Sequence, residues 1–205
     1  MSAAKFFHVQ PLPRSFYDRN ALRVAPALIG CLIVRRLGPA VLFARIVETE
    51  AYLGPHDLAC HARAGRTPRT EVMYGEPGHA YVYLVYGLHC LLNAVCGPGD
   101  DANAVLLRAA EPIAQRGPLL HSATGPGNLT TALDIGLRHN RHDLCDPRGE
   151  LFIAPRQGKA PRICRSARVG IDYAGPRWAK ENLRFCDRDS RLVSRPVPFT
   201  PRRAR

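Results

Sequence analysis

The alternation of hydrophobic and polar positions is clearest over residues 45–54, which read Arg-Ile-Val-Glu-Thr-Glu-Ala-Tyr-Leu-Gly. Side chains of a β-strand point alternately to its two faces, so a strand here places four side chains together: Ile46, Glu48, Glu50 and Tyr52. A carboxylate that faces inward carries a desolvation cost that is normally tolerated only where a partner or a reaction requires the charge. An exposed edge strand with solvated acids produces the same pattern, so the alternation alone leaves both interpretations open.

A second alternating stretch, residues 81–93, carries three tyrosines and predicts a β-hairpin. Glycine at the first of two central loop positions can take the positive φ of a tight turn, which suits Gly87. This interpretation places Tyr86 and His89 at the hairpin tip, where an aromatic side chain beside a basic surface can enter a stack of nucleic-acid bases. A tyrosine that packs on a neighbouring loop is an equally good interpretation of the residues alone.

The rest of the pattern predicts a chain of mixed helices and strands. Strands are expected over residues 31–35, 41–53, 104–110, 151–154, 168–172 and 183–185. Helices are expected over residues 17–28, kinked or divided at Pro26, and over residues 129–137. The length of 205 residues suits one domain. We expect a flexible N-terminal arm of residues 1–14, a single domain of residues 15–193 and a basic C-terminal tail of residues 194–205.

One arginine, Arg108, lies inside the apolar run of residues 104–110, which Glu111 and Pro112 are expected to close. An arginine in such a run needs an anion nearby, because an unpaired buried charge is costly. Glu50 is the natural candidate, so these two side chains are expected to lie together.

Charge narrows the range of partners. The chain has 29 Lys and Arg against 17 Asp and Glu, a net charge of +12. This surplus points to a polyanion, with nucleic acid first and an anionic membrane second. No apolar run reaches the roughly 18 residues of a transmembrane helix, and the N-terminus lacks the pattern of a signal peptide. The seven cysteines form no Cys-x-x-Cys pair, which favours reduced thiols in the cytoplasm over a disulfide framework or a zinc site.

Taken in order, these motifs resemble those of the alkyladenine (3-methyladenine) DNA glycosylase family, the purine-excising type of animals and many bacteria. The shared segments are residues 45–54, His61, residues 65–69, Pro77-Gly78, residues 81–87, Asn93 and residues 105–112, with weaker matches at 125–129 and 168–170. The resemblance implies an α+β fold, namely a single domain with a curved antiparallel β-sheet, flanking helices and a protruding β-hairpin. No cofactor is expected, and no metal site, because the metal-capable His and Cys pairs are scattered along the chain without a convergent fourth ligand.

By the same resemblance, Glu50 matches the general base, and Arg108 matches the arginine beside the attacking water. Three side chains match the aromatic walls of the base pocket: Tyr52, His61 and Tyr83. The backbone amide of His61 also matches the group that reads the purine edge. Asn93 matches the residue whose side chain excludes guanine through its exocyclic amine.

The DNA contacts come from two further segments. Tyr86 matches the wedge that enters the minor groove and fills the gap left by an extruded nucleotide, with Leu88 and His89 beside it. The loop of residues 65–69 can hold guanidinium groups against phosphates, which makes three residues candidate contacts to the DNA backbone: Arg66, Thr67 and Arg69. A solvated basic loop explains the same composition. Three positions depart from the usual family pattern without removing a catalytic group: Cys60, Thr70 and Leu88.

The sequence thus predicts a monofunctional DNA glycosylase. It would hydrolyse the N-glycosidic bond of alkylated or deaminated purines in duplex DNA after base flipping and leave an abasic site. No lysine lies in the motifs, so a Schiff-base lyase step is not expected. Two alternatives are a non-enzymatic nucleic-acid-binding module, which the charge alone supports, and a sugar hydrolase that uses Glu48 with Glu50. The expected partner is double-stranded DNA with damaged purines, bound by a monomer in the cytoplasm at the bacterial nucleoid.

Overall fold

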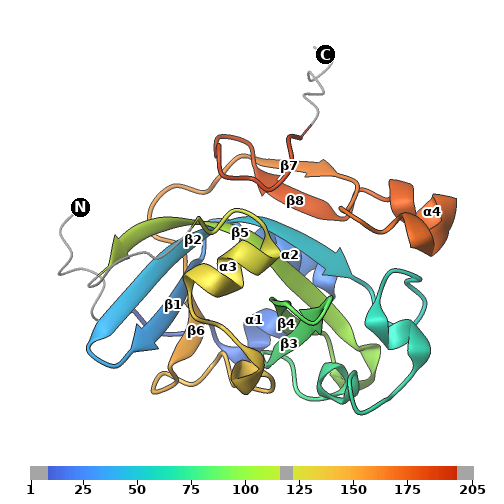
Figure 1. The fold of residues 1–205 in the computed structure, drawn as a ribbon, viewed down its shortest axis with the longest axis horizontal. Coiled ribbons are helices and arrows are strands. Elements are labelled where there is room, and N and C mark those ends of the chain that lie inside the picture. Colours follow the sequence, from blue (N-terminus) through green and yellow to red (C-terminus); the bar gives the residue numbers. More distant parts are fainter. Residues whose placement is uncertain (1–8, 116–121, 198–205) are drawn as a thin grey trace.

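Two long antiparallel strands, β2 (Ala40–Tyr52) and β5 (Asn103–Gln115), form the centre of the molecule (Figure 1). The computed structural model describes residues 9–115 and 122–197. The other strands are β1 (Leu32–Leu37), β3 (Ala80–Val85), β4 (His89–Cys96), β6 (Leu151–Ala154), β7 (Ile163–Ser166) and β8 (Arg184–Asp187). They join β2 and β5 in one antiparallel sheet of order β3-β4-β5-β2-β1-β6, with β8 paired to β2 and β7 to β8. The predicted α+β class is therefore confirmed.

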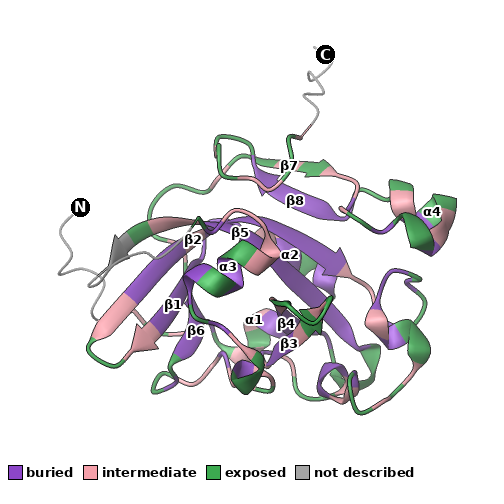
Figure 2. Cartoon of the chain, in the orientation of Figure 1, coloured by how far each residue is buried: buried purple, intermediate pink, exposed green. Residues whose placement is uncertain are grey.

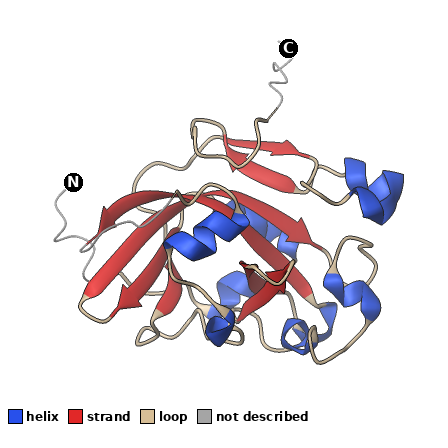
Figure 3. Ribbon diagram, in the orientation of Figure 1, coloured by secondary structure: helices blue, strands red, loops and turns tan. Residues whose placement is uncertain are grey.

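Within the described residues, four short α-helices flank this sheet (Figure 3): α1 (Arg14–Tyr17), α2 (Ala21–Leu28), α3 (Pro126–Ala132) and α4 (Gly175–Lys180). Single turns of 3-10 helix occupy His61–Ala64 (η2), Glu71–Tyr74 (η3), Gly99–Asp101 (η4), Leu137–His139 (η5) and Asp172–Ala174 (η6). Apolar residues of α1, α2 and α3 share one core cluster with the inward-facing residues of β1 to β6. Figure 2 shows this buried centre and the exposed tip of the β3–β4 hairpin.

The strand that carries Glu48 and Glu50 is paired on both sides. Along one edge β2 pairs with β5 from Leu42 to Tyr52. Along the other edge its first half pairs with β1, and residues 48–50 pair with β8. An exposed edge strand with solvated acids is thereby excluded, and both carboxylates are fully buried.

A pair of β-bulges lies beside these carboxylates. Val47 on β2 and Arg108 on β5 have no cross-strand partner in the register, because Ile46 pairs with Ala110, Glu48 with Ala109, and Thr49 with Leu107. Each bulge shifts the alternation of its strand by one residue. The double bulge therefore changes which side chains of both strands face the core.

The core contacts show the consequence of this shift on β2. Ile46 and Ala51 pack in the same apolar cluster, although strict alternation puts them on opposite faces. Thr49 also faces that side, because its hydroxyl donates to the carbonyl oxygen of Ala25 in α2 at 2.9 Å. The prediction that Ile46 shares a face with Glu48 and Glu50 is therefore wrong, and the acids face away from the core.

Several predicted elements have different bounds. The helix expected over 17–28 is two helices, divided at Asn20, whose side chain accepts from the Leu22 amide at the start of α2. Pro26 lies inside α2 without ending it. The strand expected to close at Glu111 and Pro112 continues to Gln115, and α3 covers 126–132 where 129–137 was expected.

The last third of the chain departs most from the prediction. Residues 168–172 are not a strand, because Arg168 lies in a loop and Asp172 begins η6. The strand that precedes β8 is instead β7, Ile163–Ser166, which was not predicted and which pairs with β8. Trp178 packs with Leu183, as expected of a buried aromatic between the late elements.

Both expected domain boundaries fall within packed structure. Leu12 is buried, and its amide donates to the carbonyl oxygen of Ile153 at 2.7 Å. At the other end, Ser194 joins a buried polar network on β2. Residues 1–8 and 198–205 of the predicted arm and tail lie outside the described residues.

Candidate active site

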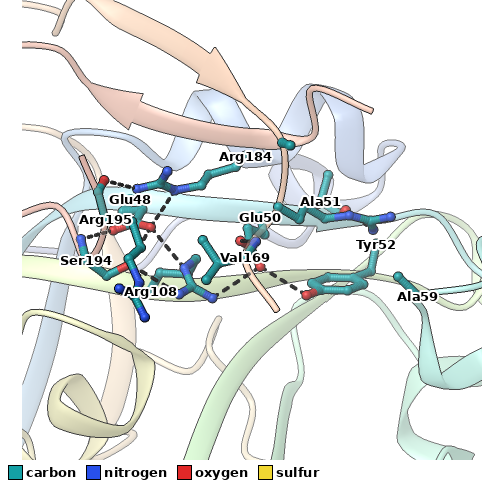
Figure 4. A network of polar contacts seen from close by, with 12 residues as sticks. Glu48, Glu50, Ala51, Tyr52, Ala59, Arg108, Val169, Arg184, Ser194 and Arg195 are labelled. Carbon is teal, nitrogen blue, oxygen red and sulfur yellow. Dashed lines mark hydrogen bonds and ion pairs between the residues drawn. The ribbon is translucent and has the colours of Figure 1, made fainter. Parts of the chain in front are cut away.

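Glu50 lies at the centre of a buried polar site (Figure 4). Its Oε2 accepts hydrogen bonds from Arg108 Nη1 at 3.3 Å and from Tyr52 Oη at 3.0 Å. Its Oε1 accepts from the Val169 amide at 2.8 Å. Strands β2 and β5 and the loop after β7 thus converge on one carboxylate. The predicted contact between Arg108 and Glu50 is confirmed.

Complete burial sets the protonation behaviour of Glu50. Desolvation raises the pKa of the Glu50 carboxyl above its ordinary value, and the opposing effects of Arg108, the Val169 amide and the Tyr52 hydroxyl do not cancel it. A carboxylate with a raised pKa is a stronger proton acceptor than a solvated one. The site therefore suits general-base chemistry.

Glu48 has a pKa that is shifted in the opposite direction to that of Glu50. Its Oε1 accepts from Arg108 Nε at 2.9 Å, from Arg184 Nε at 2.7 Å and from the Ser194 hydroxyl at 2.7 Å. Its Oε2 accepts from the Ser194 amide at 2.5 Å. Burial alone would raise the pKa of Glu48, but the Ser194 amide and the two guanidinium groups outweigh it and lower the pKa below its ordinary value. The environments of the two acids thus push their pKa values in opposite directions, which makes Glu50 the stronger proton acceptor of the two.

A second buried ion pair supports Glu50 from the other side. Arg168 donates to Asp57 at 2.5 and 2.9 Å, and both side chains are fully buried. Arg168 also donates to the Ala51 carbonyl oxygen, and its guanidinium carbon lies 4.7 Å from the centre of the Tyr52 ring. The pair fixes the loop whose Val169 amide contacts Glu50. Sequence reasoning noted Arg168 only as part of a weak motif and missed Asp57.

An aromatic pocket opens beside this network. All four predicted pocket residues line it: Tyr52, His61, Tyr83 and Asn93. Six further lining residues were not predicted: Ala59, Cys60, Met73, Tyr81, Ala104 and Tyr173. Tyr52 belongs both to the aromatic pocket and to the polar network around Glu50. Its ring forms a wall of the pocket, and its hydroxyl donates to Glu50.

The aromatic rings of the pocket hold one another in place. The His61 and Tyr83 rings meet edge to face with their centres 4.6 Å apart, and the Tyr81 ring lies 5.1 Å from Tyr83. His61 Nδ1 is 2.8 Å from the Tyr81 hydroxyl, and Asn93 Nδ2 donates to the Tyr81 carbonyl oxygen at 3.1 Å. Burial, with the charges of Arg69 and Arg63, lowers the pKa of His61 to about 4, so its ring is neutral at pH 7.

The tip of the β3–β4 hairpin presents an aromatic side chain to solvent. Tyr86 is 92% exposed and Leu88 79% exposed. The Leu88 amide donates to the Val85 carbonyl oxygen, which makes Tyr86 and Gly87 the central residues of the turn. Their φ values are +53° and +70°. The predicted position of Gly87 as first central residue is therefore wrong, because Tyr86 occupies that left-handed position.

His89 differs from its two neighbours at the tip. It begins β4, and although it is exposed, its ring atoms lie beside Gly127 of α3. A Cβ added at Gly127 would meet the His89 ring within 3.3–3.4 Å. The hairpin therefore presents Tyr86 and Leu88 outward and rests on α3 through His89.

Two side chains of the loop of residues 65–69, Arg66 and Thr67, form hydrogen bonds within the chain. Arg66 pairs with Glu71 through two hydrogen bonds at 2.9 and 2.8 Å. The Thr67 hydroxyl lies 2.9 Å from that of the buried Thr70, which also donates to the Gly65 carbonyl oxygen. Thr70, one of the positions where the sequence departs from the expected pattern, is thus an internal support for this loop.

Arg69 and a second arginine that was not predicted, Arg63, remain available on the surface. Their guanidinium groups lie over the rings of Tyr83 and Tyr173 at 5.1 and 6.0 Å. No carboxylate among the described residues forms an ion pair with either of them. Both line a second hollow, which adjoins the aromatic pocket at His61 and Tyr173.

Two further features, a metal-binding cluster and a membrane-spanning helix, are absent from residues 9–115 and 122–197. No cluster of three or more His, Cys, Asp or Glu side chains in these segments could hold a metal ion. None of the helices in the same segments is long and apolar enough to cross a membrane.

A buried carboxylate with a raised pKa beside an aromatic pocket, on a strongly basic chain, is the arrangement expected of a hydrolase that acts on bases of nucleic acid. Comparison with known proteins is more specific. The family model described as Methylpurine-DNA glycosylase (MPG) matches residues 15–191. The chain therefore belongs to the methylpurine-DNA glycosylase family and is a hydrolytic enzyme that acts on DNA.

Individual relatives agree with this family. A protein of Anaeromyxobacter dehalogenans (strain 2CP-C) is 50% identical over 188 residues, which cover 91% of this chain and 88% of the relative. One of Myxococcus xanthus (strain DK1622) is 48% identical over 91% of this chain and 95% of the relative. One of Legionella pneumophila (strain Corby) is 41% identical over 91% of this chain and 100% of the relative. Each of the three is provisionally named a 3-methyladenine DNA glycosylase.

Proposed function

We propose that this enzyme is a monofunctional glycosylase that removes alkylated or deaminated purines from duplex DNA after base flipping and leaves an abasic site. The observation that carries the proposal is the position of Glu50. It is a buried carboxylate with a raised pKa, bound to Arg108 and joined through Tyr52 to a pocket of aromatic rings.

Base flipping is needed because a stacked base cannot reach this pocket. Extrusion of a nucleotide costs a few kcal/mol, and less for a damaged base that stacks or pairs poorly. The rings of Tyr52 and Tyr83 can stack on the flipped purine. The exposed Tyr86 at the hairpin tip can fill the space that the purine leaves in the duplex.

In the reaction, Glu50 would take a proton from water as the water oxygen bonds to the sugar C1′ and the C1′–N bond breaks. The negative charge of Glu50 also favours the oxocarbenium character of the transition state. Arg108 would orient the water and oppose protonation of Glu50. No lysine is among the described residues that line the pocket. A Schiff base with the sugar is therefore not expected, and the product is an abasic site.

The DNA backbone would be held mainly by Arg69, with Arg63 beside it. Both guanidinium groups lie next to the mouth of the pocket, and phosphate is the ligand that their fork of donors fits. Arg66 and Thr67 could contact phosphate only by exchanging their present partners, Glu71 and Thr70. We propose that the enzyme acts as a monomer on chromosomal DNA, which for a bacterial protein lies in the cytoplasm.

The proposal is tested by incubating the enzyme with duplexes that each contain one lesion: 3-methyladenine, 7-methylguanine, ethenoadenine or hypoxanthine. We expect release of free base from one or more of them, and an abasic strand that remains uncut until alkali is added. Binding without base release from any duplex would instead indicate a non-enzymatic DNA-binding module. A sugar hydrolase that uses Glu48 with Glu50 is disfavoured, because Ser194 and two guanidinium groups lower the pKa of Glu48 against the effect of burial, which makes it a poor proton donor.

The hairpin turn gives a separate prediction. Tyr86→Gly removes an exposed aromatic from a left-handed position that costs a non-glycine residue about 1–2 kcal/mol. We expect the free energy of unfolding to stay the same or to rise by up to about 1 kcal/mol, because glycine also loses more entropy on folding. Affinity for lesion duplex should fall, since the wedge is lost.

The matched control for this turn is Gly87→Ala. It strains the second central position, where φ is +70°, and keeps the tyrosine. It should lower the stability measured by urea unfolding and retain more of the duplex affinity than Tyr86→Gly. If Tyr86→Gly binds lesion duplex as tightly as the wild type, Tyr86 is not the wedge.

A further inference from the structure

The segment that follows β8 returns to the centre of the sheet and contacts the catalytic arginine. We propose that Glu48 and Ser194 form a clamp that holds Arg108 in position against Glu50, and that both are positioning residues of the enzyme. This inference rests on the proposed roles of Glu50 and Arg108.

The three donor groups of Arg108 each meet a different acceptor (Figure 4). Nε donates to Glu48 Oε1 at 2.9 Å, Nη2 donates to the Ser194 hydroxyl at 3.2 Å, and Nη1 donates to Glu50 Oε2 at 3.3 Å. Two of these three contacts lie on the clamp side, and the shortest is the one with Glu48. The clamp therefore restricts rotation of the guanidinium, which keeps Nη1 within hydrogen-bond distance of Glu50.

The clamp itself is closed by Arg184 on β8. Arg184 donates to Glu48 Oε1 at 2.7 Å and to the Arg195 carbonyl oxygen at 2.5 Å. Arg184 thus binds both the Glu48 carboxylate and the segment that carries Ser194. Within that segment, Ser194 donates to Glu48 through both its amide and its hydroxyl.

Glu48 acts here as an anchor, with no direct contact to the base pocket. Its side chain is fully buried and does not line the pocket. Its negative charge also offsets the repulsion between two arginines, Arg108 and Arg184, which bind the same oxygen. Removal of one clamp contact would free Arg108 to rotate, and a displacement of about 1 Å at a reacting group can cost roughly 10²-fold in rate.

The test compares two serine variants of the full chain. Ser194→Ala removes the hydroxyl that contacts both Glu48 and Arg108. The matched control, Ser166→Ala, removes a hydroxyl that accepts from Arg184 at 3.2 Å and has no contact with Arg108. Single-turnover release of 7-methylguanine is followed as a function of pH, because this cationic base needs no proton to leave. Lesion-duplex affinity is measured in parallel.

We expect Ser194→Ala to lower the single-turnover rate about 10- to 100-fold with little change in duplex affinity. The acid limb of its pH profile should move to higher pH. This sign follows because the Arg108 charge favours ionised Glu50, and a less well-held guanidinium lets Glu50 keep its proton to higher pH. Ser194→Thr, which retains the hydroxyl, should restore most of the rate, and Ser166→Ala should behave as the wild type.

The outcomes separate the clamp from the proposed function. Absence of base release by the wild-type enzyme would overturn the proposed function. If the wild type is active, a Ser194→Ala profile equal to that of Ser166→Ala overturns the clamp alone. A rate loss without movement of the acid limb, or without rescue by threonine, also overturns the clamp, because a general loss of packing would produce that result.

Discussion

Replacement of Glu50 by Gln is expected to reduce base release by about 10²–10⁴-fold, the contribution usual for general-base catalysis. Glutamine keeps the shape of the side chain but cannot accept the proton of the attacking water. Arg108 retains its contact with Glu48, so the fold and the pocket should persist. Lesion-duplex affinity should therefore stay near that of the wild type while single-turnover excision falls.

The matched control for this change is Glu111→Gln, which makes the same chemical substitution on the neighbouring strand. Glu111 pairs with Arg45 and does not line the pocket. Excision by this variant should remain close to that of the wild type. Substantial turnover by Glu50→Gln on any lesion would remove Glu50 from the mechanism, whatever the control shows.

The substitution Asp57→Asn is expected to cause the largest loss of stability, about 3–5 kcal/mol. It leaves the charge of Arg168 buried without its carboxylate partner, and neither side chain of the pair has contact with solvent. The free energy of unfolding from urea titration measures the loss. Excision should also fall, since Arg168 holds the loop whose Val169 amide contacts Glu50.

The exposed pair of Arg162 and Asp189 is the control for this prediction. Its side chains are 69% and 54% exposed, so solvent screens the attraction. Asp189→Asn should leave the urea transition unchanged within error. A transition of Asp57→Asn as mild as that of Asp189→Asn would show that the buried pair contributes little to the fold.

Much of the catalytic centre could be predicted from local pattern. The strand at residues 41–53 followed from alternation, and β2 is observed over Ala40–Tyr52. The contact between Arg108 and Glu50 followed from the cost of an unpaired charge in an apolar run, and the two groups are 3.3 Å apart. Pattern alone did not bring the pocket residues together; the family resemblance named Tyr52, His61, Tyr83 and Asn93.

The remaining features depend on distant partners or on register. Arg168 and Asp57 are 111 positions apart, and Ser194 and Glu48 are 146 positions apart. Neither pair leaves a periodic signal in the sequence, and a polar, basic segment such as the one around Ser194 has the composition of a solvated tail. The bulges were missed for a related reason, because alternation along one strand carries no information about its partner.

The paired bulges at Val47 and Arg108 constrain how this enzyme can change over evolutionary time. Deletion of one residue between Ile46 and Thr49 would remove the bulge on β2 and leave the bulge at Arg108 without its counterpart, so Glu50 and Arg108 would lose their present alignment across the two strands. Substitution of a side chain in the same segment would cause no such loss. Homologous lineages should therefore differ in composition across this stretch while they retain its length, and insertions should accumulate in the surface connections instead.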